Sequence, residues 1–393
     1  MKFIHFGCWN KGLCDVESKS NGLSQTMSKL NEFVKQNKDI EFITIAGDNY
    51  YPDKDKKKDK DKDKDKDKDK EKDKEKNQKT MKTDEFLSGV KCLPEHILKY
   101  ILLGNHEFDK VKLYNKDDKD YKDVDRCHLF NFEKKSFSRS NNTIFFNDVI
   151  YRIFGSNTLI IMIDTTLYEM YDDYIAEKKD NPNAELNLYE TCYRYLFLDE
   201  NDDNEKKIGL KFEDLLEKQK QKIMEILSKN TKYNNIIFIG HHPIITEKVK
   251  KGIQYTYSLI ELFKSLVDKL SQYQQKYYLC ADTHNYQKTK IKMNELIIEQ
   301  YITGTGGAEQ DECVNPKIHN FSESKDYSDD IKENLKGIIF NINECRKEFG
   351  FLLCEEKDGQ LEFKFIPSIG LNGGYYDKYI KYKTKYLKLK NKN

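Results

Sequence analysis

The sequence has no long apolar segment, no surplus of either charge and no closely spaced pair of cysteines. No run of residues is long and apolar enough to cross a bilayer, so we expect no membrane-spanning helix. The first ten residues also lack the basic start and apolar stretch of a secretory signal peptide. With 68 basic and 67 acidic residues the formal net charge is +1, which excludes attraction of the whole chain to nucleic acid or an anionic membrane.

Cysteine is present without a pattern, and histidine is scarce. The nine cysteines are an odd number and include no Cys-x-x-Cys pair, so the sequence predicts a soluble protein of a reducing, intracellular compartment. Half of the eight histidines fall in three short blocks: His106, His241, His242 and His284.

Four short blocks, far apart in the chain, carry residue types that bind divalent and trivalent metals. Each follows a short run of β-branched or aromatic residues, which predicts a buried strand. The blocks are 47–51, 104–107, 240–243 and 281–287, and the runs before them are 42–46, 100–103, 236–239 and 277–280. A weaker strand over 2–7 ends at Cys8. Functional groups on loops at strand ends are the usual layout of an α/β active site.

Between these strands, apolar residues recur at helical spacing, which favours a layered α/β core. The predicted helices cover residues 23–34, 215–227 and 259–270. Three more strands are predicted to complete the second sheet of a β-sandwich, with a hairpin turn at Asp358-Gly359: 337–342, 349–354 and 361–365. Two polar segments are predicted to be insertions: 109–142 and 172–212.

Two further segments are predicted to lie outside the core of a domain spanning residues 1–368. Every residue from Asp53 to Lys76 is charged, so we expect a disordered insertion over 53–80. It is either a low-complexity expansion without function or a gate over the neighbouring block. The tail at 369–393 is basic and rich in tyrosine, and either is solvated or contacts nucleic acid or another anionic partner.

The order of the blocks resembles that of the calcineurin-like metallophosphoesterases, and most closely their purple acid phosphatase branch. That branch carries Gly-Asp-x-Gly, Gly-Asp-Asn-x-Tyr, Gly-Asn-His-Asp/Glu, Gly-His-x-Pro and Gly-His-x-His. Residues 47–51 match the second motif completely, while 104–107 and 240–243 match the third and fourth. The resemblance implies an α/β fold, a four-layer α/β/β/α sandwich of two mixed sheets. The tail and the composition resemble giant DNA virus proteins, which would place the chain in a host cytoplasm or a virion.

The family resemblance also implies hydrolysis of a phosphorylated substrate, favouring a phosphomonoester, by two divalent or trivalent ions of zinc, manganese or iron. Two such ions neutralise the ester, orient it and acidify a bound water. The implied ligands of the first ion are Cys8, Asp48, Tyr51 and His284, and those of the second are Asp48, Asn105, His241 and Asp282. His106 is implied to be a general acid or phosphate donor. We place His242 with it as a catalytic residue, although packing of the loop would also account for that side chain.

Two candidate ligands depart from the family pattern. Cys8 stands where the family has aspartate, and Asp282 stands where it has histidine. A thiolate suits zinc and a carboxylate suits harder ions, so both can bind metal. Cys8 is equally compatible with a small buried apolar residue, Asp282 with a turn cap, and Tyr51 with a plain hydrogen-bonding role. The alternative function is therefore a non-catalytic or weakly active binding protein on a degenerate metallophosphatase scaffold.

Overall fold

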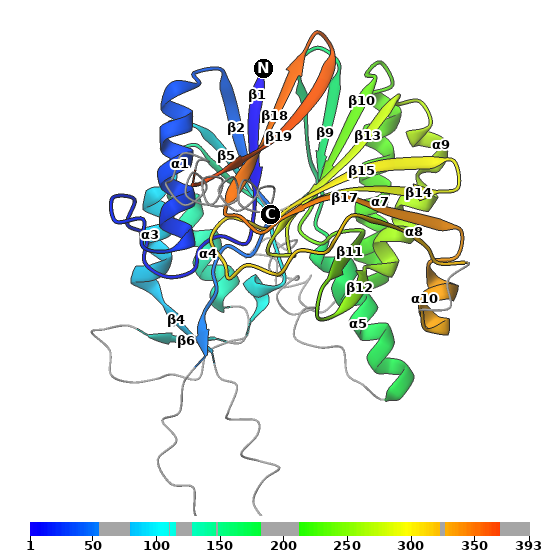
Figure 1. The fold of residues 1–393 in the computed structure, drawn as a ribbon, viewed down its shortest axis with the longest axis horizontal. Coiled ribbons are helices and arrows are strands. Elements are labelled where there is room, and N and C mark those ends of the chain that lie inside the picture. The colour runs from blue at the N-terminus through cyan, green and yellow to red at the C-terminus, as the bar shows by residue number, and fades with distance from the viewer. Residues whose placement is uncertain are drawn as a thin grey trace, which may run out of the picture.

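Two mixed β-sheets form the middle of the molecule, and helices cover the outer side of each (Figure 1). A computed structural model describes residues 1–54, 79–109, 111–114, 128–146, 148–181, 212–322 and 327–369. The sheets have six strands in the order β19-β18-β1-β2-β5-β7 and eight strands in the order β16-β17-β14-β15-β13-β10-β9-β8. The predicted α/β/β/α sandwich is confirmed.

The six-stranded sheet has a parallel half and an antiparallel edge. Its parallel strands are β1 (Lys2–Phe6), β2 (Ile40–Ile45), β5 (Leu98–Ile101) and β7 (Thr143–Phe145). The antiparallel edge consists of β18 (Gly350–Lys357), which pairs with β1, and β19 (Gln360–Pro367). Because β1, β2 and β5 run in one direction, the loops that follow them meet at one edge of the sheet.

The eight-stranded sheet repeats this arrangement. Its parallel strands are β9 (Thr158–Met162), β10 (Asn235–Ile239), β13 (Gln275–Cys280) and β15 (Leu296–Thr303). Antiparallel strands flank them: β8 (Ile150–Phe154), β14 (Tyr286–Met293), β16 (Lys317–Asn320) and β17 (Ile338–Arg346). A separate hairpin, β11 (Ile245–Lys248) with β12 (Gly252–Tyr255), follows β10.

Helices lie beside each sheet (Figure 1). Those of the first half are α1 (Gly22–Gln36), α3 (Thr83–Cys92), the short 3-10 helix η1 (His106–Phe108) and α4 (His128–Ser138). The rest are α5 (Thr166–Asp180), α7 (Phe212–Lys229), α8 (Tyr257–Ser265), α9 (Val267–Leu270) and α10 (Asp329–Asn334). The helices predicted at 23–34 and 215–227 are confirmed as α1 and α7, and the third divides into α8 and α9. Within the described ranges, none of these helices combines the length and apolar character needed to cross a membrane.

Three apolar cores lie between the four layers, as strand alternation requires. On β1, Phe3 packs between the sheets and stacks on Phe42 with ring centroids 4.7 Å apart, whereas Ile4 faces α1. On β10, Ile237 belongs to the core between the sheets and Phe238 to the core beneath the helices. Successive side chains on a strand point to opposite faces, so each central strand supplies two cores.

Two expectations from the sequence need correction. The three C-terminal strands do not complete one sheet: β17 joins the eight-stranded sheet, while β18 and β19 join the six-stranded sheet beside β1. The segment 109–142 is not simply a polar insertion, because α4 buries Leu129, Phe130 and Phe137 in the core.

The ends of the predicted insertion at 53–80 are ordered. There, β3 (Asp53–Lys54) pairs with β4 (Lys79–Lys82), and β4 pairs with β6 (Val111–Tyr114). Residues 55–78 lie outside the described residues, as do 182–211 of the predicted 172–212 insertion and residues 370–393 of the tail.

Among the described residues, two disulfides join segments far apart in the sequence. Cys14 in the loop after β1 bonds to Cys92 at the end of α3, and Cys313 bonds to Cys345 on β17. Disulfides persist in oxidising compartments. These four cysteines therefore count against the predicted reducing compartment. Cys8, Cys280 and Cys354 are free and buried.

Candidate metal centre

The candidate site lies where the carboxyl ends of strands from both sheets meet. Cys8 follows β1, Asp48 follows β2, and Asp282 follows β13. All three residues have positive φ, at 53°, 52° and 53°. A left-handed conformation costs a residue other than glycine on the order of 1–3 kcal/mol and is concentrated at functional sites. The same unusual turn at three strand ends aims these side chains into a common space.

Glycines let the loops approach closely enough to form this space. A Cβ atom on Gly7 would lie 2.6 Å from the Cβ of Ala281, which belongs to the other sheet. On Gly104 it would lie 2.5 Å from an oxygen of Asp48 and 2.9 Å from the His241 ring. Gly7 and Gly104 thus have a steric role, because any side chain there would push the candidate ligands apart.

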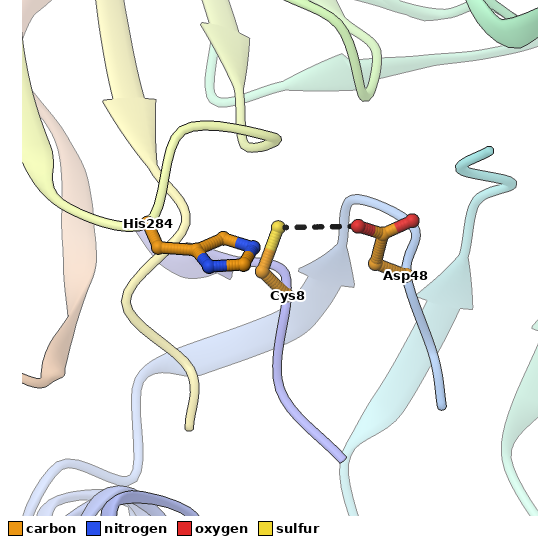
Figure 2. A group of neighbouring side chains, drawn as sticks. All are labelled: Cys8, Asp48 and His284. Atoms are coloured by element: carbon orange, nitrogen blue, oxygen red, sulfur yellow. Dashed lines mark hydrogen bonds between the residues drawn. The ribbon is translucent and has the colours of Figure 1, made fainter. Parts of the chain in front are cut away.

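The first ligand group consists of Cys8, Asp48 and His284, whose ligand atoms all lie within 4.8 Å of one another. Figure 2 shows the thiol and the imidazole between the two sheets, with the carboxylate opposite. Cys8 donates to Asp48 Oδ2 over 3.7 Å. The hydroxyl of Tyr51 joins the group, at 2.8 Å from Asp48 Oδ2 and 3.0 Å from His284 Nε2. The four residues predicted for the first ion therefore do come together.

The second ligand group consists of His241, His242 and Asp282, again with ligand atoms within 4.8 Å of one another. His241 uses Nδ1 on the carbonyl oxygen of Ala46 at 2.6 Å, while its buried Nε2 has no hydrogen-bond partner. A histidine fixed through Nδ1 on a backbone carbonyl, with Nε2 facing the site, has the usual arrangement of a metal ligand.

Asp48 connects the two groups. Its Oδ2 faces Cys8 and Tyr51, whereas Oδ1 lies 3.3 Å from His241 Nε2 and accepts the His106 backbone N–H at 3.1 Å. Burial would raise the pKa of Asp48, but the nearby His241 and His106 hold it well below its ordinary value. Burial likewise would lower the pKa of His241, but Asp48 raises it to about 10. The space between these residues therefore favours positive charge, as a metal site must.

Asn105 and His106 lie at the edge of the site, whereas His242, which was predicted to be catalytic, lies within the second ligand group. The buried Oδ1 of Asn105 has no hydrogen-bond partner, and Asn105 lines the same cavity as His242 and Asp282. The His106 ring is 30% exposed, lies 4.7 Å from the Tyr51 ring and is held through Nδ1 by Asp109 at 2.6 Å. Nε2 of His242 lies 2.7 Å from a carboxylate oxygen of Glu169 on α5.

Sequence reasoning did not find four residues that shape the site: Glu107, Asp109, Glu169 and Lys248. Glu107 is fully buried and accepts N–H groups from Gly104, from Asp48 at 3.2 Å and from Asn49 at 2.5 Å. It ties the second block to the first. Burial, and then the charge of Asp48, raise the pKa of Glu107 to about 7. Its place in the Gly-Asn-His-Glu block was the available signal.

Lys248 is the least expected neighbour. Its ammonium lies 2.9 Å from Asp282 Oδ2, and the side chain is only 16% exposed. Burial would raise the pKa of Asp282, but Lys248 and the two histidines lower it to about 2. Burial would lower the pKa of Lys248, but Asp282 raises it above its ordinary value. A cavity of about 290 Å³ opens here, lined by Asn105, Glu169, His242, Lys248 and Asp282 among others.

The donor set fits a metal at the first group. A thiolate, a carboxylate, an imidazole and a phenol within reach of one another suit zinc better than a hard trivalent ion. Burial lowers the pKa of His284, so its ring is neutral and able to coordinate. The second group offers two imidazoles and a carboxylate, but that carboxylate already has a cationic partner in Lys248.

Comparison with known proteins identifies the class. The family model for calcineurin-like phosphoesterases matches residues 1–286, so the chain belongs to that family. Membership supports metal-dependent phosphoester hydrolysis and the binding of divalent metals.

Two solved structures are similar to this chain at low identity. One is GAP50, the anchor in the inner membrane complex of Plasmodium, at 14% identity and a TM-score of 0.49, covering 94% of this chain and 85% of that one. The other is a phosphopantetheinyl hydrolase from Mycobacterium tuberculosis, at 10% identity and a TM-score of 0.35, covering 78% and 90%. No curated protein matches the sequence.

Proposed function

We propose that the protein is a metal-dependent phosphatase acting on phosphomonoesters, of the purple acid phosphatase kind. The observation that carries the proposal is Asp48, whose two oxygens face two separate groups of ligand atoms. A carboxylate in that position is able to bridge two ions. The complete match of residues 47–51 to the Gly-Asp-Asn-x-Tyr motif supports the choice of branch.

The chain's own residues divide the remaining work. Cys8, Asp48, Tyr51 and His284 would hold one ion, and His241, Asp282 and Asn105 would face a second. Ions bound there would supply charge neutralisation of the phosphoryl oxygens and an acidified water. Asp109 holds Nδ1 of His106 at 2.6 Å and fixes the ring at the edge of the site, where His106 would protonate a leaving group. His242, in contact with Glu169, orients the loop that carries His241.

The test is release of phosphate from an aryl phosphate with zinc, manganese and iron supplied in turn. Asp48→Ala removes the residue shared by both groups, so we expect a loss larger than the roughly 100-fold effect of an outer partner of a metal ligand. The loss of activity in His241→Ala should be nearly as large as that in Asp48→Ala. Asp39→Ala is the matched control, because Asp39 only pairs with Lys2 at the surface. A wild-type rate equal to that of Asp48→Ala would reject the proposal.

A second candidate function is a non-catalytic binding protein on the same scaffold. The observation that favours it is the ion pair between Lys248 and the candidate ligand Asp282. Elemental analysis of protein purified without chelators separates the two functions. Retained metal together with phosphate release supports the enzyme, whereas the absence of both supports the binding protein. The anionic partner of the 369–393 tail, the intracellular location and the viral origin stay predictions from the sequence.

A further inference from the structure

The strand β11 fixes Lys248 beside the second ligand group. Glu247, its neighbour, faces β16, where it contacts Lys317 at 2.6 Å and His319 at 3.0 Å. The Glu247 carbonyl also accepts the side-chain amide of Gln287 at 3.1 Å. Since successive side chains on a strand point in opposite directions, these contacts on Glu247 turn Lys248 toward Asp282. The direction of the strand therefore fixes the Lys248 ammonium beside Asp282.

The two ligand groups differ in what balances their charge. Among the described residues, Lys248 is the lysine that contacts a candidate ligand, and that ligand belongs to the second group, whereas no described lysine or arginine forms an ion pair with a ligand of the first group. When metal binding deprotonates Cys8, the ligands carry three negative charges: the Cys8 thiolate and the carboxylates of Asp48 and Asp282. One divalent ion and the ammonium balance these three charges, and a second divalent ion would have to displace the ammonium from Asp282.

We propose that Lys248 is a built-in cation that takes the place of the second metal, so that the centre holds one divalent ion at Cys8, Asp48 and His284. The inference rests on the proposed phosphate hydrolysis at this site, and it replaces the second ion of that proposal with the ammonium of Lys248. The positive charge that a second ion would offer a phosphoryl group comes instead from the ammonium, which lines the cavity beside Asn105 and Asp282. Lys248 would therefore have two roles. It would contact the phosphoryl group of the substrate, and it would prevent a second ion from binding.

The test counts metal rather than turnover. The full chain is dialysed against buffered micromolar zinc and measured by elemental analysis, for the wild type and for Lys248→Met. We expect about one zinc per chain in the wild type and about two after Lys248→Met, because Asp282 is then free to coordinate. Lys248→Arg keeps the charge and should stay near one.

The control is Lys229→Met, which removes an exposed lysine paired with Glu225 at the end of α7, away from β11 and the ligand groups, and should leave the count unchanged. Two zinc ions in the wild type, or one in a folded Lys248→Met, would overturn the proposal. Should Lys248→Met not fold, Lys248→Gln and the wild-type count still decide it. Phosphate release is measured separately: a count that rises from one to two without any hydrolysis would reject the proposed function and keep this inference.

Discussion

The two ligand groups occupy equivalent strand ends but are built differently. The first draws Cys8 and Asp48 from the six-stranded sheet and His284 from the loop after β13, in the eight-stranded sheet. The second takes its residues from loops of the eight-stranded sheet alone, and its carboxylate is held by Lys248. A group that spans two sheets depends on how those sheets sit against each other. Changes that loosen the junction should therefore affect the first group before the second.

Among the described residues, the largest expected effect on the free energy of unfolding comes from the two disulfides. Cys14–Cys92 spans 78 residues and Cys313–Cys345 spans 32. Loop-closure entropy predicts a loss in the free energy of unfolding of about 4.5 kcal/mol for Cys14→Ser with Cys92→Ser, and about 3.7 kcal/mol for the other pair. Urea denaturation of the two double variants measures both. Equal stability of the variants and the wild type would show that these thiols are not bonded in solution.

The next largest effect on stability is the pH dependence caused by His5, a histidine that connects the two sheets near the site. His5 on β1 is fully buried, with Nδ1 2.9 Å from the Thr44 hydroxyl and Nε2 3.2 Å from the Cys280 carbonyl of the other sheet. Burial lowers its pKa from 6.5 to about 4. Between these values the unfolded chain binds the proton and the folded chain does not. The neutral His5 ring therefore does not reduce the free energy of unfolding above pH 6.5. As the pH falls from 6.5 toward 4, proton binding by the unfolded chain lowers this free energy.

The size of that loss is about 3 kcal/mol, from the shift in pKa. Chemical denaturation of the wild type and His5→Gln across this range measures it. The variant should be less stable at neutral pH but should lose less stability on acidification. His96→Gln is the control, since His96 is exposed and lies just before β5 begins, away from the contact between the sheets. Parallel pH profiles for the wild type and His5→Gln would contradict the prediction.

A smaller effect tests the loop that presents Asp48. Glu107→Gln replaces an acceptor of three backbone N–H groups with a side chain that must turn an NH₂ toward one of them. We expect zinc affinity to fall roughly 10–100-fold, the usual effect of an outer partner of a metal ligand. Isothermal titration with zinc measures it.

Glu133→Gln is the matched control for this change. Burial, and then the nearby Glu107, raise the pKa of Glu133 well above its ordinary value, so it is neutral and glutamine preserves its charge. Equal affinities of the two variants would show that Glu107 does not position Asp48.

The same comparison explains how much the sequence could predict. The strand ends and the residue types after them followed from local patterns, because backbone periodicity and short motifs are local. The family resemblance selected the four residues of the first group, which the structure brings together. Lys248 was not recognised as a partner of Asp282, because the two are joined by the direction of a hairpin strand that no motif records. The disulfides were missed for the same reason: Cys14 and Cys92 are brought together by the packing of α3, not by spacing.

The finest distinction between the groups is the thiol of Cys8. Burial, and then the charge of Asp48, raise its pKa well above the ordinary value, so without metal it remains a thiol that packs among Ala46, Ala281 and Ala308. Cys8→Asp exchanges a soft donor for a hard one in the group that spans the sheets. We expect the preference for zinc over manganese to fall about tenfold or more, near 1.4 kcal/mol, measured by competition dialysis. Cys354→Ala, a change to a buried cysteine in the core between the sheets, should leave the preference unchanged. An unchanged preference after Cys8→Asp would mean that Cys8 only fills space, and the first ion would then be held by Asp48, Tyr51 and His284 without a sulfur ligand.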